Sequence, residues 1–158
     1  MLGADILAVL RTVREKNPKV HILGIEETDT QKGDKNPLSG SRDKAIAKNF
    51  WNVFQSGKRH IILFGRLHCA KESNWLFENI YEQSSPTLRH KILSVSVISE
   101  HQYGPLEAFI YFLDEIGLKR KIFVIVNLED LSQLFAGHFP TLIESIFLKY
   151  DAIVVFRS

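Results

Sequence analysis

The stretch SRDKAIAKNFWNVFQSGKRHIILFGRLHCAK, residues Ser41–Lys71, decides how this chain is expected to fold. Ser41 is a typical helix N-cap, and the residues after it place apolar side chains at helical spacing until a glycine ends the pattern. The run Ile61–Phe64 is apolar throughout, which predicts a buried strand. A turn that carries Arg66 and His68 follows this strand. Because helix starts and strand ends meet at one edge of an α/β sheet, the stretch predicts a ligand site at that edge.

The rest of the chain continues the alternation of helices with short apolar strands. Further strands are predicted at Val20–Ile25, Ile92–Ile98, Ile122–Val126 and Ala152–Phe156, and helices at Met1–Val13, Ser73–Gln83, Leu106–Ile116 and Leu131–Lys149, with a surface loop at Thr30–Gly40. Strands that are apolar on both faces are typical of a parallel sheet covered on two sides. The predicted fold is a single α/β domain over residues 1–158, with three layers: a mainly parallel five-stranded sheet and helices on both of its faces. The alternative is that the chain is a half-length or divergent relative of a larger fold.

Composition narrows the classes of protein. The 20 basic residues exceed the 18 acidic residues by two and are spread along the chain, so no nucleic-acid partner is predicted. No run approaches the roughly 20 apolar residues of a membrane span. Cys69 is the single cysteine, which excludes an internal disulfide and makes a reducing compartment, the cytoplasm, the expected location. Location within a secreted toxin or effector is the alternative.

Charged side chains are expected to gather at the carboxyl edge of the predicted sheet. A histidine there could take a proton from water, while arginines stabilise the anion that develops, so the set could carry out hydrolysis or bind a small anionic ligand. The histidines show no helical metal-ligand spacing, no glycine-rich phosphate loop is present, and cofactor and metal remain unknown. The candidate catalytic residues are His68, Glu26 and Arg42, and the candidate ligand-binding residues are Arg66, Glu100 and His101.

Three segments resemble the C-terminal half of the erythromycin esterase and ChaN/TIKI-like superfamily. They are NPKVHILGIEE, SRDKAIAKNFWNVFQSGKRHIILFGRLH and KYDAIVVF, which match in order a strand ending in an acid, a helix opening with arginine, a strand leading to a histidine turn, and a final strand. The resemblance implies that Glu26 is the acid after the strand, Arg42 the helix-start arginine and His68 the second histidine of the turn. Gly65 stands where esterase-like members have the first histidine, and the G-E-x-x-H segment of the superfamily has no counterpart.

The superfamily includes erythromycin-cleaving esterases, metal-dependent peptidases, a haem-binding lipoprotein and domains of large bacterial toxins. Two functional classes therefore stay open. The first is a non-catalytic or degenerate domain that binds a ligand or partner, which the missing motif favours. The second is a hydrolase of esterase or metal-dependent peptidase type, with His68 as general base, Glu26 as its orienting group or a metal ligand, and Arg42 and Arg66 as anion binders.

The first helix suggests a third arrangement, in which two chains pair and complete one site. Its apolar positions Leu2, Ile6, Val9 and Val13 line up on one face. This face either packs on the sheet of its own chain or forms the contact of a homodimer.

Overall fold

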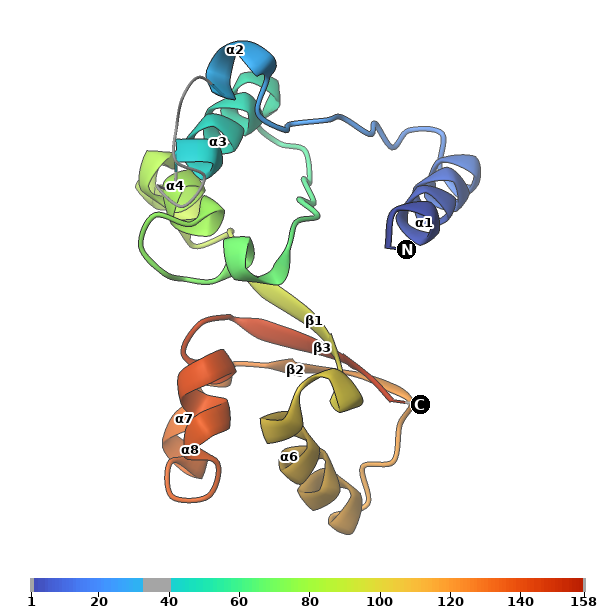
Figure 1. Cartoon of the computed structure of the whole chain (residues 1–158), viewed down its shortest axis with the longest axis vertical. Coiled ribbons are helices and arrows are strands. Elements are labelled where there is room, and N and C mark those ends of the chain that lie inside the picture. The colour runs from blue at the N-terminus through green and yellow to red at the C-terminus, as the bar shows by residue number, and fades with distance from the viewer. Residues whose placement is uncertain (1, 33–40, 158) are drawn as a thin grey trace.

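The computed structural model describes residues 2–32 and 41–157, with side chains placed for residue 8, residues 10–31 and residues 42–157 (Figure 1). Its helices are α1 (Leu2–Lys16), α2 (Asp29–Lys32), α3 (Ser41–Val53), α4 (Leu76–Gln83), α5 (Pro86–Arg89), α6 (Gly104–Glu115), α7 (Leu128–Phe135) and α8 (Pro140–Leu142). The strands are β1 (Val95–Ser99), β2 (Ile122–Val126) and β3 (Ala152–Phe156). Two 3-10 turns, η1 (Arg66–Cys69) and η2 (Glu100–Gln102), and a π-helical turn, η3 (Ile143–Phe147), complete the elements.

The five-stranded parallel sheet predicted from the sequence is wrong. Within the described residues, the sheet has three strands in the order β1-β3-β2, with β1 parallel and β2 antiparallel to the central strand. The helices α6, α7 and α8 lie on one side of this sheet in Figure 1. The expected third layer on the other face is therefore not present in the described part of the chain, and the molecule is richer in helix than predicted.

Two of the predicted strands are extended segments without strand pairing. In Ile61–Phe64, side chains alternate as in a strand: Ile61 is 87% exposed and Leu63 63% exposed, whereas Ile62 and Phe64 pack against a cluster of α3 and α4 side chains. In the same way, Ile25 packs on this cluster. Ile25, Ile62 and Phe64 are thus covered by helix side chains, and no sheet ladder is needed to explain their burial.

The remaining predicted elements differ mainly at their ends. The strands at Ile122–Val126 and Ala152–Phe156 have the predicted bounds, and the third predicted strand begins later, at Val95. The long predicted C-terminal helix is divided into α7 and α8, and α8 begins at Pro140, which cannot continue a helix. Most of the predicted loop Thr30–Gly40 and the apolar side chains of Leu2, Ile6 and Val9 lie outside the described residues and side chains.

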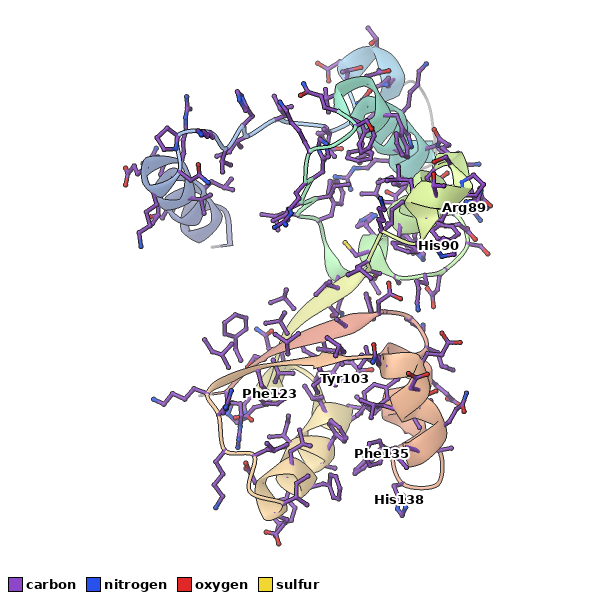
Figure 2. The ribbon with its side chains drawn as sticks, turned by 180° about the vertical axis from the view of Figure 1, so that it is seen from behind. Arg89, His90, Tyr103, Phe123, Phe135 and His138 are labelled. Carbon is purple, nitrogen blue, oxygen red and sulfur yellow. The ribbon has the colours of Figure 1, made fainter. Side chains whose placement is uncertain are left out.

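Two hydrophobic clusters hold the described chain together. One joins α3 to α4 and contains Ile46, Ala47, Phe50, Leu76 and Ile80. The other fills the space between the sheet and its helices, where Phe135 lies with the aromatic rings of α6 (Figure 2). In Figure 1 the first cluster belongs to the upper part of the molecule and the second to the lower part, while α1 stands apart from both.

The turn η1 connects these two parts. Cys69 and Ala70 at its end pack with the cluster under the sheet, and the Cys69 carbonyl accepts a hydrogen bond from the Ser94 hydroxyl just before β1. The Arg66 carbonyl at its start accepts a hydrogen bond of 3.0 Å from the hydroxyl of Tyr150. The backbone of η1 is thus fixed from the sheet side at both ends of the turn. These two anchors determine the position of His68, which lies between them.

In the part of the chain that the structure describes, no helix is both long and apolar enough to cross a membrane.

Candidate functional site

The centre of the candidate site is a carboxylate–imidazole pair between α3 and η1. Nδ1 of His68 lies 2.8 Å from each carboxylate oxygen of Asp43. Asp43 belongs to the first turn of α3, where the unpaired amides and the dipole of the helix favour a negative charge. Its side chain is only 2% exposed, and that of His68 is 24% exposed. The carboxylate is therefore enclosed, and the imidazole forms the boundary between it and the surface.

Aromatic rings hold the imidazole on two sides. The rings of Phe64 and Trp75 approach it edge-on, at centroid distances of 5.3 and 5.1 Å. Gly65 lies beside the remaining edge, because a Cβ atom at this position would come within 3.3 Å of Cδ2 of His68. The ring is thus held by Asp43 at Nδ1, while Cδ2 borders a position without a side chain.

Glu26 and Arg42 form an ion pair next to this dyad. Nε of Arg42 donates to one carboxylate oxygen of Glu26 at 3.0 Å, and Nη2 donates to the other at 2.6 Å. These hydrogen bonds raise the pKa of Arg42 above its ordinary value. The guanidinium also lies 5.5 Å from the ring centroid of Phe64, the same ring that contacts His68. Both side chains are about half exposed, so the pair borders the dyad at the surface.

The three candidate catalytic residues therefore come together, but with different partners from those expected. The sequence hypothesis has Glu26 orienting His68, whereas in the structure Asp43 holds His68 and Glu26 holds Arg42. Asp43 was missed as a site residue, although it immediately follows Arg42 at the start of a predicted helix. Its signal in the sequence was an acid in the first helical turn, which is also explained by helix stability alone.

The candidate ligand-binding residues lie elsewhere. The guanidinium of Arg66 stacks on Tyr103, 5.0 Å from the ring centroid, and so points to the sheet part of the molecule. Glu100 is buried after β1 and accepts a hydrogen bond of 2.9 Å from Nε of Arg157, and His101 lies 3.5 Å from the other oxygen of Glu100. Arg66 and Glu100 therefore contact the sheet part of the molecule, through Tyr103 and Arg157, and not the dyad.

The cluster around Glu100 is a structural network at the end of the sheet. Arg157, which follows β3, also binds both carboxylate oxygens of Asp114 on α6. This hydrogen bonding lowers the pKa of Asp114 and raises that of Arg157. The charges of this cluster bind one another and attach α6 to the end of β3. This structural role accounts for them without a ligand.

Cys69, the residue after His68, does not extend the dyad. Burial, and secondarily the negative charge of Asp43, raises the pKa of its thiol. A raised pKa keeps the sulfur protonated near neutral pH, and the thiol form is a poor nucleophile. The geometry favours an inert packing role for this cysteine, in agreement with its place at the edge of the cluster under the sheet.

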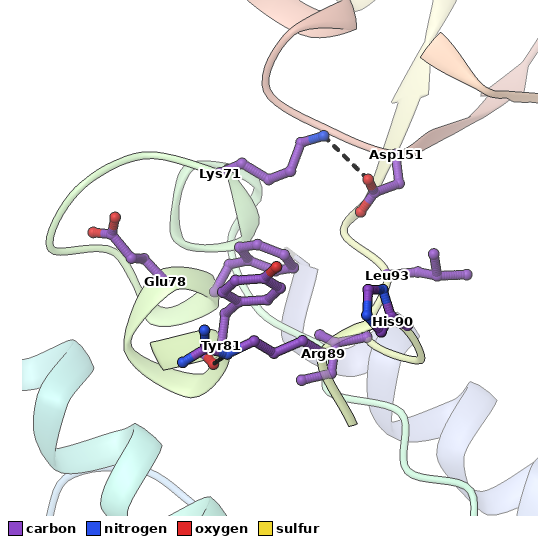
Figure 3. A pocket seen from close by; sticks show the side chains of 9 residues that line it. Lys71, Glu78, Tyr81, Arg89, His90, Leu93 and Asp151 are labelled. Atoms are coloured by element: carbon purple, nitrogen blue, oxygen red, sulfur yellow. Dashed lines mark hydrogen bonds and ion pairs between the residues drawn. The ribbon is translucent and has the colours of Figure 1, made fainter. Parts of the chain in front are cut away.

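Two pockets lie where the upper part meets the sheet. The larger, of about 450 Å³, is shown in Figure 3 and has an ion pair of 3.1 Å between Lys71 and Asp151 on one wall. Opposite, the Tyr81 ring stacks with Phe77, and the Arg89 guanidinium lies over it. A second pocket of about 360 Å³ adjoins β2 and shares the Lys71–Asp151 wall. Neither pocket is lined by the dyad.

Metal binding has no preformed site in the described chain. Among its residues, no group of three or more histidine, cysteine, aspartate or glutamate side chains is arranged to hold an ion. Glu26, the metal ligand considered from the sequence, pairs with Arg42 instead.

Comparison of the chain with family models, with curated proteins and with solved structures found no match. The assignment of roles consequently depends on the geometry of the dyad and on the residues around it.

Proposed function

We propose that this chain is a hydrolase-like enzyme that cleaves an ester or amide bond, with His68 as general base and Asp43 as the group that orients it. The observation that carries the proposal is the contact of 2.8 Å between Nδ1 of His68 and the buried carboxylate of Asp43. A carboxylate that accepts a hydrogen bond from Nδ1–H keeps the ring proton on Nδ1 and leaves Nε2 as the basic nitrogen, the arrangement that general-base hydrolysis requires. Because the ring is already held in place, little entropy is lost in orienting it when the reaction occurs.

In this proposal, Nε2 of His68 takes a proton from a water molecule as the water attacks the carbonyl carbon of the substrate. The proton then passes from Nε2 to the leaving alkoxide or amine, so that the imidazole is regenerated. Asp43 keeps its negative charge throughout and stabilises the imidazolium between these two steps. Water is the co-reactant, and no oxidant or reductant is needed.

Arg42 is the candidate for binding the negative charge on the substrate oxygen. Its ion pair with Glu26 uses two of the five N–H groups of a guanidinium, and it shares the Phe64 ring with His68. A cation next to the base stabilises an oxyanion as it forms. The resemblance to the erythromycin esterase superfamily supports this proposal, since Arg42 and His68 are the residues that it matches. Arg66 is not included, because it stacks on Tyr103.

The test is hydrolysis of a panel of 4-nitrophenyl esters and fluorogenic peptides, with and without added divalent metal. We expect His68→Gln and Asp43→Asn each to lower kcat by about 10²–10⁴-fold, the usual contribution of a general base and its support. His138→Gln is the matched control, because this histidine is exposed beyond α7, and it should keep wild-type activity. A wild-type chain that is inert to the whole panel, or a His68→Gln variant with full activity, would overturn the proposal.

A second candidate function is binding of a small anionic ligand without catalysis. The observation that favours it is the pocket of Figure 3, where Lys71, Arg89 and His90 accompany an exposed aromatic ring. A carboxylated aromatic compound such as 4-hydroxybenzoate fits this chemistry, since its ring can pack edge-on against the stacked Tyr81–Phe77 pair and its carboxylate can bind the cations. Calorimetric titration with 4-hydroxybenzoate should then show saturable binding that Tyr81→Ala abolishes and His138→Gln retains.

A further inference from the structure

The face of the sheet that points away from its helices is apolar. Strand β3 is central, and the register aligns Val97 of β1, Val154 of β3 and Val124 of β2 in one row across this face. Val97 is 61% exposed and Val124 57% exposed. The other exposed apolar side chains that share the face by strand alternation are Val95, Ile122, Val126 and Phe156. We call these residues the open face.

The open face requires a cover. A monomer rarely exposes one continuous apolar patch larger than on the order of a few hundred Å². A face built from six exposed Val, Ile and Phe side chains on neighbouring strands reaches that size, while the opposite face is filled by Ile153, Val155 and the helices. The same asymmetry is present along both edge strands, because on β1 and β2 the outward side chains are the more exposed ones.

The two ends of strand β2, at one edge of the open face, carry opposite charges. Lys119, Arg120 and Lys121 lie exposed directly before β2. Glu129 and Asp130 lie exposed directly after it, in the first turn of α7. Because β2 runs the length of the sheet, its basic end and its acidic end are separated by the whole strand. The surface is therefore complementary to a copy of itself whose strands run in the reverse direction.

We infer that a second copy of this chain covers the open face, in a two-fold dimer with the strands of the two sheets reversed. The row of Val97, Val154 and Val124 lies at the centre, and the basic segment of each copy meets the acidic segment of the other, so that every contact occurs twice. This surface is not the first-helix face that the sequence suggested for a dimer.

The size of the face sets the strength of this dimer. Three strands of five residues make a face of roughly 16 by 10 Å in backbone dimensions, so the buried area falls below the roughly 800 Å² per partner of a standard interface. Such contacts give weak complexes, and a Kd in the micromolar range is expected. Screening of the end charges by salt should weaken the dimer further.

The test is sedimentation velocity of the full chain over low to high micromolar concentrations. We expect a monomer–dimer equilibrium for the wild type, and Val124→Lys should raise its Kd by at least about tenfold, since it places two desolvated charges at the centre. Val124→Thr keeps the β-branched shape and should raise the Kd less. The matched control is Leu134→Lys, which changes a residue 69% exposed on α7 and should leave the Kd unchanged.

Charge exchange tests the reversed orientation of the strands. Arg120→Glu and Glu129→Arg should each weaken the dimer, and the double variant should return the Kd toward the wild-type value, because the exchanged charges again attract across the two-fold axis. A double variant weaker than both single variants would overturn the reversed arrangement. A wild type that is monomeric at all concentrations, or a folded Val124→Lys variant that dimerises like the wild type, would overturn the inference as a whole.

Discussion

Replacing Phe50 with alanine tests whether the α3–α4 cluster is the support of the dyad. Phe50 is 7% exposed, and its ring lies 5.1 Å from Trp51, 5.7 Å from Phe54 and 5.9 Å from His60, measured between centroids. Truncating a buried phenylalanine costs about 3–5 kcal/mol in the free energy of unfolding. Because this cluster is small and partly bordered by exposed residues, the site can partly collapse, and the expected loss is near the lower value, about 3 kcal/mol.

The assay is urea denaturation followed by tryptophan fluorescence, since Trp51 contacts the truncated ring directly. Tyr111→Ala is the control: this aromatic residue on α6 is 68% exposed, and its removal should change stability by less than about 0.5 kcal/mol. A loss below about 1 kcal/mol for Phe50→Ala would show that the ring is not the packed centre of the cluster that positions α3 against the segment leading to His68.

Three further perturbations have defined outcomes. Gly65→Ala should lower hydrolytic activity, because the new methyl group presses on Cδ2 of His68. It should cost little stability, because the backbone at residue 65 has an ordinary negative φ. The ester assay measures the first effect and thermal melts by circular dichroism measure the second. Asp151→Ala should destabilise the chain by about 1–3 kcal/mol in urea, since it leaves the backbone amide before β1 without its acceptor, whereas Lys71→Met should cost no more than about 1 kcal/mol. Burial raises the pKa of Tyr150 from 10.0 to about 12. The stability that its neutral hydroxyl provides is therefore complete below pH 10 and is lost as the pH rises through 12. Tyr150→Phe should remove this alkaline dependence of the melting temperature.

The sequence predicted extended segments better than it predicted their partners. Ile122–Val126 and Ala152–Phe156 are strands with the predicted bounds, because uninterrupted β-branched residues leave few alternatives. Ile61–Phe64 has a similar composition, yet its apolar side chains pack on α3 and α4 instead of joining the sheet. Apolar character reports that a segment is buried on at least one side, but it does not identify the neighbour that buries it.

Strand direction was the second point that composition could not determine. The antiparallel pairing of β2 with β3 has the same apolar residues as a parallel pairing would have, and the prediction depended on the assumption that every connection is a crossover. The wrong prediction of a third layer has the same origin. An all-parallel sheet would have required helices on both faces, whereas in the described part of the chain this mixed sheet is covered on one.

The candidate site was predicted in part. The sequence brought Glu26, Arg42 and His68 to one region; in the structure Arg42 and His68 both contact the Phe64 ring, and Glu26 pairs with Arg42. Which of the adjacent residues Arg42 and Asp43 faces the histidine depends on the phase of α3 against η1. That phase is set by tertiary packing, which the local pattern does not contain.

In the proposed function, Asp43 fixes the tautomer of His68 so that Nε2 is the basic nitrogen. Nitrogen-15 NMR of the histidine side chains measures this directly, because a protonated and an unprotonated ring nitrogen have well-separated shifts, and His68→Gln identifies the signal. At a pH where the ring is neutral, the proposal predicts a proton on Nδ1 of His68 and none on Nε2, with this preference weakened in Asp43→Asn. A proton on Nε2 in the wild type, or a tautomer unchanged by Asp43→Asn, would contradict it.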